Sequence, residues 1–539
     1  MKDFAAVKWI RKSCGNRDAE GVALVLLNAL IGVCTTAFAV ISKLVIDSAQ
    51  NEDIDALKHN VLILLAAILI QITARIASSL LETVSQGKSE IYLKTKVFSK
   101  ILNGNFAKIN EYHSGELMTR LTADVSVVSE NAVHIVPTAV LNIVRALSAA
   151  IALLSMDRRF ALVFIACGIA LSLATLILRG PIKKLHKNVQ EKDGMLRSFM
   201  QESIENLFAV KVFRIEHKMI DRSKKNQKAL FKAKVQRKSI SIVSQIAFSC
   251  AFAAGFLAAV AYGANGVIKG TMTFGTVMSI VLLVNQLQTP ISGITGIIPC
   301  FFSMVASASR LMEICEQPEE PEEIENISYE DFLGVKARGL SFSYDGEPVI
   351  TNTDFDINKG DFVCVSGRSG AGKTTLFKLF TGLYTPTTGE LAVSTEKGQK
   401  NANVLRDLIT FVPQDNMLFS GSVRENITLL NRDASDREIN DALAFSCADE
   451  FVSSLPQGLE TILGEDGSGV SQGQAQRLAI ARAILSGKKI LLMDEATASL
   501  DAVTEERFIN NLKNTHGITV VFITHREKVL DSADKIIEL

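Results

Sequence analysis

The sequence predicts a multidomain membrane protein, in which an all-α domain of six membrane-spanning helices precedes an α/β P-loop domain. Three observations support this fold class. Of the 539 residues, 48% are hydrophobic, and they concentrate in the first 310 positions. An acidic run with two prolines, "EICEQPEEPEEIENISYED", follows at 313–331. Beyond it the composition is that of a soluble domain, which contains a glycine-rich GxxxxGK[ST] sequence.

Six apolar segments are long enough to cross a bilayer, which takes about 20 residues. The first is also too long for the apolar core of a signal peptide. Some segments contain polar residues such as Gln71 and Gln288, so the alternative for these is a buried helix of a soluble domain. Six such segments within 310 residues favour membrane spans. The predicted spans are 21–46, 61–83, 133–155, 160–178, 241–267 and 274–304.

Lysine and arginine gather on one side of the predicted membrane. The N-terminus and the long stretches 84–130 and 180–240 are basic, whereas the first short connection is acidic. Because basic segments remain on the cytoplasmic side, we expect the N-terminus and the P-loop domain to be cytoplasmic, at a plasma or inner membrane. The two long stretches have helical composition. As intracellular hairpins of two antiparallel helices, each would extend roughly 45 Å from the bilayer.

Charge and cysteine spacing argue against other classes of protein. The formal net charge is zero, which gives no indication of nucleic-acid binding. The eight cysteines show neither metal-binding nor disulfide spacing. The apolar segments, the acidic run and the glycine-rich sequence divide the chain into three expected parts. These are a transmembrane domain at 1–312, an acidic linker at 313–334 and a nucleotide-binding domain at 335–539.

A phosphate-binding loop lies between a predicted buried strand and a helix in "DFVCVSGRSGAGKTTLFKLF". Its glycines let consecutive backbone N–H groups face phosphate oxygens. The Lys373 ammonium can reach the β- and γ-phosphates, the Thr374 hydroxyl can bind Mg²⁺, and Tyr344 can stack on adenine. ATP and Mg²⁺ are therefore the expected ligands. The predicted ATP-binding residues are Tyr344, Gly367, Arg368, Ser369, Gly370, Ala371, Gly372, Lys373, Thr374 and Thr375.

Polar side chains also follow three further predicted strands. The strand 490–493 ends in two carboxylates: Asp494 can hold Mg²⁺, and Glu495 can take a proton from an attacking water. Gln414 follows a short strand, where its amide can contact both the metal and the water. His525 ends a strand and can hydrogen-bond the γ-phosphate, although a histidine in this position is also compatible with a structural role. The predicted catalytic residues are Glu495, His525 and Gln414, and the predicted Mg²⁺ ligands are Thr374, Gln414 and Asp494.

The order of these features resembles that of the ATP-binding cassette (ABC) transporters. A tyrosine, a P-loop, a glutamine, a small-residue turn with its helix, paired carboxylates and a histidine follow one another as they do in that family. Two stretches of the membrane half, "SGELMTRLTADV" at 114–125 and "FMQESIENLFAVKVFRIE" at 199–216, resemble the first and second intracellular loops of its exporter-type members. The resemblance covers nearly the whole chain.

The resemblance implies a role for "VSQGQ" at 470–474, which corresponds to the signature turn of the family. This turn contacts the ATP that the P-loop of a second cassette holds. It follows from the resemblance that Ser471, Gln472, Gly473 and Gln474 contact the partner's ATP, and that Asp501 of the D-loop reaches across the dimer.

Several positions depart from the family pattern. Val470 and Gln472 stand where leucine and glycine are usual. Glu465 resembles a glutamate that contacts the membrane domain, but Asp466 replaces the usual arginine. One cassette and six spans are half of a transporter, so the resemblance implies a dimer. Glu495 and His525 are both intact, which favours a homodimer over a heterodimer and favours an active ATP hydrolase.

Polar residues within the predicted spans are the candidates for a substrate cavity, since ionisable groups in spans usually face a cavity or a partner. The alternative is hydrogen bonding between helices. If several line one cavity, the substrate is amphipathic with an anionic group, such as a peptide, a lipid-like molecule or a drug. The resemblance implies ATP-driven export by alternating access; an exporter-fold importer and an ATP-gated sensor or channel are the alternatives. The candidate cavity residues are Arg75, Arg145, Gln245, Asn285 and Gln286.

Overall fold

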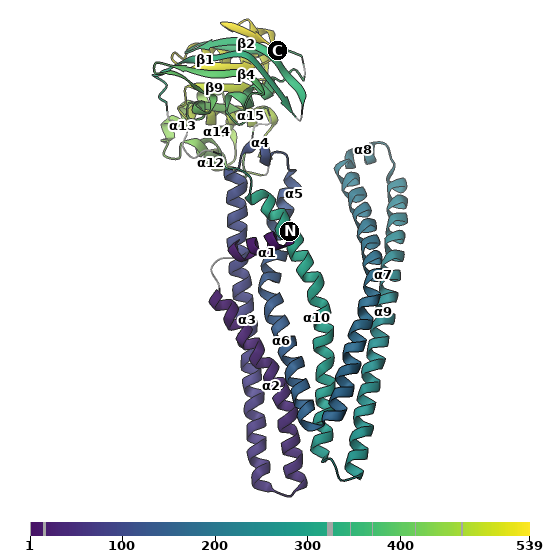
Figure 1. Ribbon diagram of the computed structural model, residues 1–539. Helices are drawn as coiled ribbons and strands as arrows, with labels where there is room; N and C mark the ends of the chain where they lie inside the picture. The colour runs from purple at the N-terminus through teal and green to yellow at the C-terminus, as the bar shows by residue number, and fades with distance from the viewer. Residues whose placement is uncertain are drawn as a thin grey trace. The chain divides into compact units, whose positions relative to one another are not determined.

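The computed structural model describes residues 2–13, 18–320, 327–344, 346–368, 370–414, 417–464 and 467–539. The chain folds into two compact units (Figure 1). The first unit comprises Met1–Leu102 and His113–Glu316 and is helical. The second unit comprises Asn103–Tyr112 and Gln317–Leu539, and it contains the sheets.

Long helices form the first unit. Three of them, α3, α7 and α9, have 50, 48 and 53 residues, so each is roughly 70–80 Å long at about 1.5 Å per residue. That is more than twice the hydrocarbon thickness of a bilayer. The helical elements are α1 (Lys2–Ser13), α2 (Asp18–Gln50), α3 (Ile54–Asn103), α5 (Ser114–Thr119), the π-helix η1 (Arg120–Asp124), α6 (Val125–Met156), α7 (Arg158–Glu205), α8 (Leu207–Val212), α9 (Glu216–Ile268) and α10 (Phe274–Cys315).

Five helical segments in the described part of the chain are long and apolar enough to cross a membrane. They overlap five of the six predicted spans. The remaining predicted span, 160–178, lies in α7, where the side chains of 169–183 are outside the described residues. The count of six therefore stays a prediction. The five segments are Ala19–Gln50, Ile54–Asn103, Ser114–Met156, Ser249–Ile268 and Gly296–Cys315.

Two apolar clusters pack the helices of the first unit against one another. One cluster joins α1 to α3, α6 and α10, and the other joins α2, α6, α7, α9 and α10. Where these side chains lie outside the lipid, their burial stabilises the unit by roughly 25 cal/mol per Å² of apolar surface. Within the predicted spans the lipid is as apolar as the side chains, so van der Waals packing holds the helices together. Fully buried members include Leu93, Val97, Val128 and Leu311 in the first cluster and Ala39, Ala149, Leu283 and Val284 in the second.

A partly buried network of ion pairs links η1 to α10. Arg120 and Asp124, at the two ends of η1, are only 5% and 4% exposed. Arg120 Nη2 lies 2.7 Å from the Glu116 carboxylate and 3.1 Å from that of Glu313. Arg310 of α10 donates its Nε–H to Asp124 Oδ2 at 2.8 Å. Buried charges persist only when paired, so the network fixes the position of α10 along η1.

The second unit contains an antiparallel sheet and a parallel sheet. The strand order is β2-β1-β4-β5 in the antiparallel sheet and β11-β3-β10-β9-β6 in the parallel sheet. A third, two-stranded pairing joins β7 to β8. The strands are β1 (Phe332–Tyr344), β2 (Glu347–Asn358), β3 (Phe362–Ser366), β4 (Thr388–Thr395), β5 (Gly398–Asn401), β6 (Ile409–Val412), β7 (Gly421–Ser422), β8 (Ile462–Leu463), β9 (Ile490–Asp494), β10 (Thr519–Ile523) and β11 (Lys535–Glu538).

Both faces of the parallel sheet are buried, and alternate residues along its strands belong to different cores. In β3, Val363 and Val365 pack with α11 and the antiparallel sheet, whereas Cys364 packs on the opposite face with α15 and α16. This explains the uninterrupted apolar strands of the sequence. A separate helical cluster packs α12 to α15 together. The α-helices are α4 (Phe106–Ile109), α11 (Lys373–Phe380), α12 (Val423–Ile427), α13 (Asp436–Phe445), α14 (Asp449–Ser454), α15 (Gln472–Leu485), α16 (Ala502–Lys513) and α17 (Glu527–Leu530).

The short segment 103–112, which contains α4, belongs to the second unit although it is distant from the rest of that unit in sequence. The backbone N–H of Phe106 donates to Glu320 Oε1 at 3.2 Å, and Glu320 also pairs with Arg406. The Phe106 ring meets the Tyr384 ring edge to face, with centroids 5.9 Å apart. Glu320 and Tyr384 thus attach the segment to the sheets of the second unit.

Candidate nucleotide site

The candidate residues follow the carboxyl ends of neighbouring strands in the parallel sheet. β3 leads into the P-loop, and β9 ends at Asp494. β10 is followed by His525, and β6 is followed by Gln414. Because these four strands are parallel and adjacent in the order β3-β10-β9-β6, their carboxyl ends lie along one edge of the sheet. Ligands of open α/β sheets bind at this edge.

The P-loop has the backbone conformation of a phosphate cradle. Gly370 and Gly372 have φ values of +84° and +89°, which side chains rarely adopt. A Cβ on Gly372 would also lie 2.8 Å from Val349 Cγ1. The Lys373 ammonium folds back over the loop and donates to the carbonyls of Gly367 at 2.9 Å and Arg368 at 3.1 Å. Among the predicted loop residues, Ser369 lies outside the described part of the chain.

The oxygen ligands that Mg²⁺ prefers lie together beside this loop. The Thr374 hydroxyl donates to Asp494 Oδ2 at 2.9 Å, which joins the start of α11 to the end of β9. Thr374 is exposed, whereas Asp494 is 3% exposed and therefore held in place by its surroundings. A hydroxyl and a carboxylate at this spacing fit Mg²⁺, which takes one or two protein oxygens with phosphate and water oxygens.

Two further candidates, Gln414 and Glu495, are also brought together. Gln414 Nε2 donates to Glu495 Oε2 at 3.0 Å, although the residues are 81 positions apart. Gln414 is exposed and Glu495 is partly buried. The carboxylate is thus oriented by an amide and remains accessible to water, as a general base must be.

The backbone at Glu495 is strained. Its φ is +48°, in the left-handed region, where a residue with a side chain pays roughly 1–2 kcal/mol. Its N–H donates to the Ile523 carbonyl at 3.0 Å, and its carbonyl accepts the Ala498 N–H at 2.9 Å. Strain of this kind is retained where surrounding contacts hold it, and it clusters at functional sites.

His525 lies beyond β10, two residues after Ile523. It is exposed, and within the described residues it makes no hydrogen bond. The imidazole is therefore free to contact a ligand.

The predicted signature turn is the N-terminus of α15, a helix of 14 residues. The Ser471 hydroxyl accepts the Gln474 N–H at 3.3 Å, and Gln474 Oε1 accepts the Ser471 N–H at 2.8 Å, which together form a capping box. Ser471 and Gln472 are exposed at this helix terminus, where backbone N–H groups favour an anion. The exposure of Gln472 explains how a side chain replaces the usual glycine there without a clash.

Gly473 does not have that freedom, because a Cβ on it would lie 2.6 Å from the Ser499 carbonyl oxygen. Ser499 belongs to the D-loop, which ends at Asp501. Asp501 caps α16 by accepting the N–H groups of Val503 at 3.1 Å and Thr504 at 3.0 Å. The Thr504 hydroxyl also donates to it, and these bonds lower the pKa of Asp501. Asp501 thus has a capping role within its own chain, which the sequence analysis missed.

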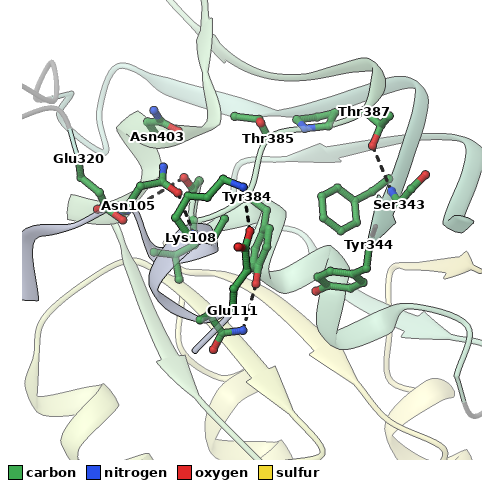
Figure 2. Close-up of a pocket in the computed structure, with 17 residues that line it drawn as sticks. Asn105, Lys108, Glu111, Glu320, Ser343, Tyr344, Tyr384, Thr385, Thr387 and Asn403 are labelled. Atoms are coloured by element: carbon green, nitrogen blue, oxygen red, sulfur yellow. Dashed lines mark hydrogen bonds and ion pairs between the residues drawn. The ribbon is translucent and has the colours of Figure 1, made fainter. Parts of the chain in front are cut away.

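Tyr344 lies in a cavity of about 760 Å³ within the second unit (Figure 2). Its ring meets the Tyr384 ring edge to face at 5.5 Å, and Asn110 Nδ2 donates to the Tyr384 hydroxyl at 3.3 Å. Lys378 Nζ lies 6.0 Å from the centre of the Tyr344 ring. Sequence reasoning found Tyr344 but missed Tyr384, which connects it to segment 103–112; the only signal was an aromatic residue soon after the P-loop helix.

The structure does not bring all the candidate cavity residues of the membrane helices together. Gln286 Nε2 donates to the Thr35 carbonyl at 2.8 Å, and Gln71 Nε2 donates to the Thr35 hydroxyl at 3.1 Å. These amides therefore join helices, as the alternative interpretation expected. Arg145 is half-buried, and its Nε has no partner among the described residues. Arg75 and Asn285 are exposed in the described chain, and the side chain of Gln245 lies outside the described residues.

Comparison with known proteins decides the family. Residues 22–291 match the sequence model of the ABC transporter transmembrane region, and residues 350–498 match that of the ABC transporter. The chain belongs to the ABC transporter family. A multidrug resistance ABC transporter ATP-binding and permease protein of Lactococcus lactis is 30% identical, over 82% of this chain and 76% of that protein.

Two further ABC transporters extend the match over nearly the whole chain. An uncharacterized ABC transporter ATP-binding protein of Bacillus subtilis is 27% identical, over 97% of this chain and 88% of its own length. A solved structure of a bacterial Atm1-family ABC exporter with ATP bound has a TM-score of 0.79 at 21% identity, covering 97% of this chain and 94% of that one. The predicted fold class, a helical membrane domain followed by an α/β cassette, is confirmed.

As an ABC transporter, the protein couples ATP hydrolysis to transport across the membrane. The chain carries one transmembrane region and one cassette, so it is a half-transporter and acts as a dimer. The predicted family, activity and nucleotide are therefore confirmed.

Proposed function

We propose that two copies of this chain form an exporter in which each ATP is bound between the P-loop of one copy and the signature turn of the other. The observation that carries this proposal is the exposed capping box at Ser471. Its helix N-terminus is built to receive an anion, yet the cassette already has a separate phosphate cradle at Lys373. A second anion-binding turn in the same cassette can bind the phosphates of an ATP molecule that the P-loop of a second copy holds.

The residues along the sheet edge have separate roles in ATP hydrolysis. Lys373 releases its two loop carbonyls to bind phosphate oxygens, and the glycines of the loop present backbone N–H groups. Thr374 and Asp494 would hold Mg²⁺, which neutralises charge on the phosphates when bound. Gln414 orients Glu495, and Glu495 takes the proton of the attacking water. His525 hydrogen-bonds the γ-phosphate.

The proposed substrate is amphipathic and carries an anionic group. The Arg145 guanidinium lies in a membrane helix and has no carboxylate partner among the described residues. An unpaired cation in a span costs on the order of 2.5–3.5 kcal/mol on insertion scales, so it is retained where it has a use. The L. lactis relative is a multidrug resistance transporter and the structural neighbour is an exporter, and both support outward transport.

The cassette is proposed to lie on the cytoplasmic side of a plasma or inner membrane. The stretches 84–130 and 180–240 are lysine-rich, and basic loops remain cytoplasmic. We also propose a homodimer, because Asp494 at the end of β9, Glu495 directly after it and the histidine after β10 are all present in this chain, so each copy supplies a full catalytic set.

Replacement of the base tests this proposal. In Glu495→Gln the side chain keeps its size and its contact with Gln414, but it can no longer accept a proton. We expect ATP binding within about threefold of wild type and kcat lower by about 10²–10⁴, the usual contribution of a general base. The measurement is ATPase activity and nucleotide binding in lipid nanodiscs, repeated with lipids, peptides and drugs as stimulators. Normal turnover by this variant would remove Glu495 from the mechanism.

A further inference from the structure

Gln476 is a buried amide in the helix that begins at the signature turn. It lies in α15, five positions after Ser471, and is 2% exposed. Its Nε2 donates to the backbone carbonyl of Glu495 at 3.0 Å, and its Oε1 accepts the backbone N–H of Ser499 at 3.1 Å. One partner can only accept and the other can only donate, so the orientation of the amide is fixed by its surroundings.

The Glu495 end of this bridge is the strained peptide group. With φ at +48°, Glu495 adopts a conformation that depends on neighbouring contacts. Its carbonyl accepts two hydrogen bonds, one from the Ala498 N–H within the same turn and one from Gln476 of another helix. Gln476 therefore connects α15 to the peptide group from which the carboxylate projects.

The Ser499 end lies in the D-loop, which is held from two sides. On one side the Ser499 carbonyl lies so close to Gly473 that a Cβ on Gly473 would be 2.6 Å from the carbonyl oxygen. On the other side, Arg526 donates to the carbonyls of Ala498 at 2.8 Å and Leu500 at 3.3 Å. A displacement of α15 therefore displaces the D-loop and the Glu495 backbone together.

We propose that Gln476 is a positioning residue that transmits the position of the signature turn to the catalytic carboxylate of the same chain. This inference rests on the roles proposed above for Ser471 and Glu495. In the dimer, Ser471 contacts the ATP bound by the partner, whereas Glu495 acts on the ATP bound by its own chain. When the signature turn binds the partner's ATP, α15 shifts and Gln476 shifts with it. Gln476 then brings the Glu495 carboxylate to the position from which it can take a proton from the attacking water. One buried amide in each copy thus couples the two ATP sites.

The first test replaces Gln476 in the full-length dimer in nanodiscs. Gln476→Met removes both hydrogen bonds at similar volume, so kcat should fall by about tenfold or more, as expected for a misplaced catalytic group. The Kd of a fluorescent ATP analogue should change by less than about threefold, since the P-loop is untouched. Gln476→Glu keeps the acceptor for Ser499 and loses the donor to Glu495, so kcat should also fall.

The control is Thr410→Val on β6, which removes a buried hydroxyl that has no partner among the described residues and should leave kcat unchanged. A Gln476→Met enzyme whose kcat stays within about twofold of wild type would overturn the positioning role.

A double-mutant cycle with Ser471→Ala tests transmission. If Gln476 carries the effect of the signature contact, the double variant Ser471→Ala/Gln476→Met should be no slower than the slower single variant, because coupled residues are not additive. Multiplicative losses would show that Gln476 acts only locally and would overturn the transmission. If Ser471→Ala alone is fully active, the composite site itself is refuted, whereas the result for Gln476→Met still decides the positioning role.

Discussion

Glu320 should control how firmly segment 103–112 is attached to the cassette. The Glu320 carboxylate accepts the Phe106 N–H at 3.2 Å and pairs with Arg406, and the two charged side chains are only 24% and 27% exposed. Charge-assisted hydrogen bonds contribute about 1.5–3 kcal/mol. Allowing for partial screening by solvent, we take about 2 kcal/mol for both contacts together. Glu320→Ala should therefore raise the population of the detached segment about 30-fold, since about 1.4 kcal/mol is a factor of ten.

Hydrogen exchange measures this population directly. In the full-length protein in nanodiscs, peptides covering 103–112 should exchange about 30-fold faster in Glu320→Ala, because their amides exchange from the open state. Glu320→Gln keeps an acceptor for the Phe106 N–H but loses the ion pair, so its increase should be smaller.

Asp331→Asn, which removes the ion pair between Asp331 and Lys397 elsewhere in the cassette, is the matched control and should leave these peptides unchanged. Unchanged protection of 103–112 in Glu320→Ala would refute the assigned role of this carboxylate.

Three other variants or reagents test separate parts of the site. Cys364 is fully buried, and burial raises its pKa to about 12, so a maleimide should not label it between pH 7 and 9 in the folded protein; labelling at the rate of an exposed thiol would contradict its burial. Gly372→Ala places a Cβ 2.8 Å from Val349 Cγ1 at a φ of +89°, so ATP affinity should fall by tenfold or more, about 1.4 kcal/mol. Tyr344→Ala should weaken binding of ATP more than that of inorganic triphosphate, because only ATP has a base to stack; equal effects would place the base elsewhere.

The sheet edge was predictable because its signals are local. Each candidate follows an apolar strand, and parallel neighbours bring such ends together; the strand predicted at 490–493 is β9, one residue longer. The pairing of Gln414 with Glu495, 81 residues apart, follows from the strand order once the sheet is known. Motif spacing therefore located the P-loop, the carboxylates and the glutamine without any long-range information.

The missed residues act through backbone groups. Gln476 bonds the carbonyl of Glu495 and the N–H of Ser499, and Arg526 bonds two further carbonyls of the D-loop. No pattern of side chains marks a backbone partner, so these contacts appear only in three dimensions. The limits of the membrane spans could not be predicted from the sequence either. The helices α3 and α9 continue without a break beyond the apolar segments, so the ends of the helices do not coincide with the ends of the spans.

Complementation between two inactive variants tests the shared site most directly. Lys373→Ala destroys the phosphate cradle of one copy, and Ser471→Arg blocks the signature turn of the other. Neither homodimer has an intact site, but a mixed dimer has one, formed by the P-loop of the Ser471→Arg chain and the turn of the Lys373→Ala chain. Co-expressed, differently tagged chains should recover ATPase activity, whereas each variant alone should show almost none. One intact site in half of the randomly paired dimers sets an upper limit of ~25% of wild type. Because the acting Glu495 belongs to the Ser471→Arg chain, the loss of its signature contact should lower the recovered activity further, by about the factor seen in Gln476→Met. Full activity of Ser471→Arg alone, or no recovery in purified mixed dimers, would contradict the account.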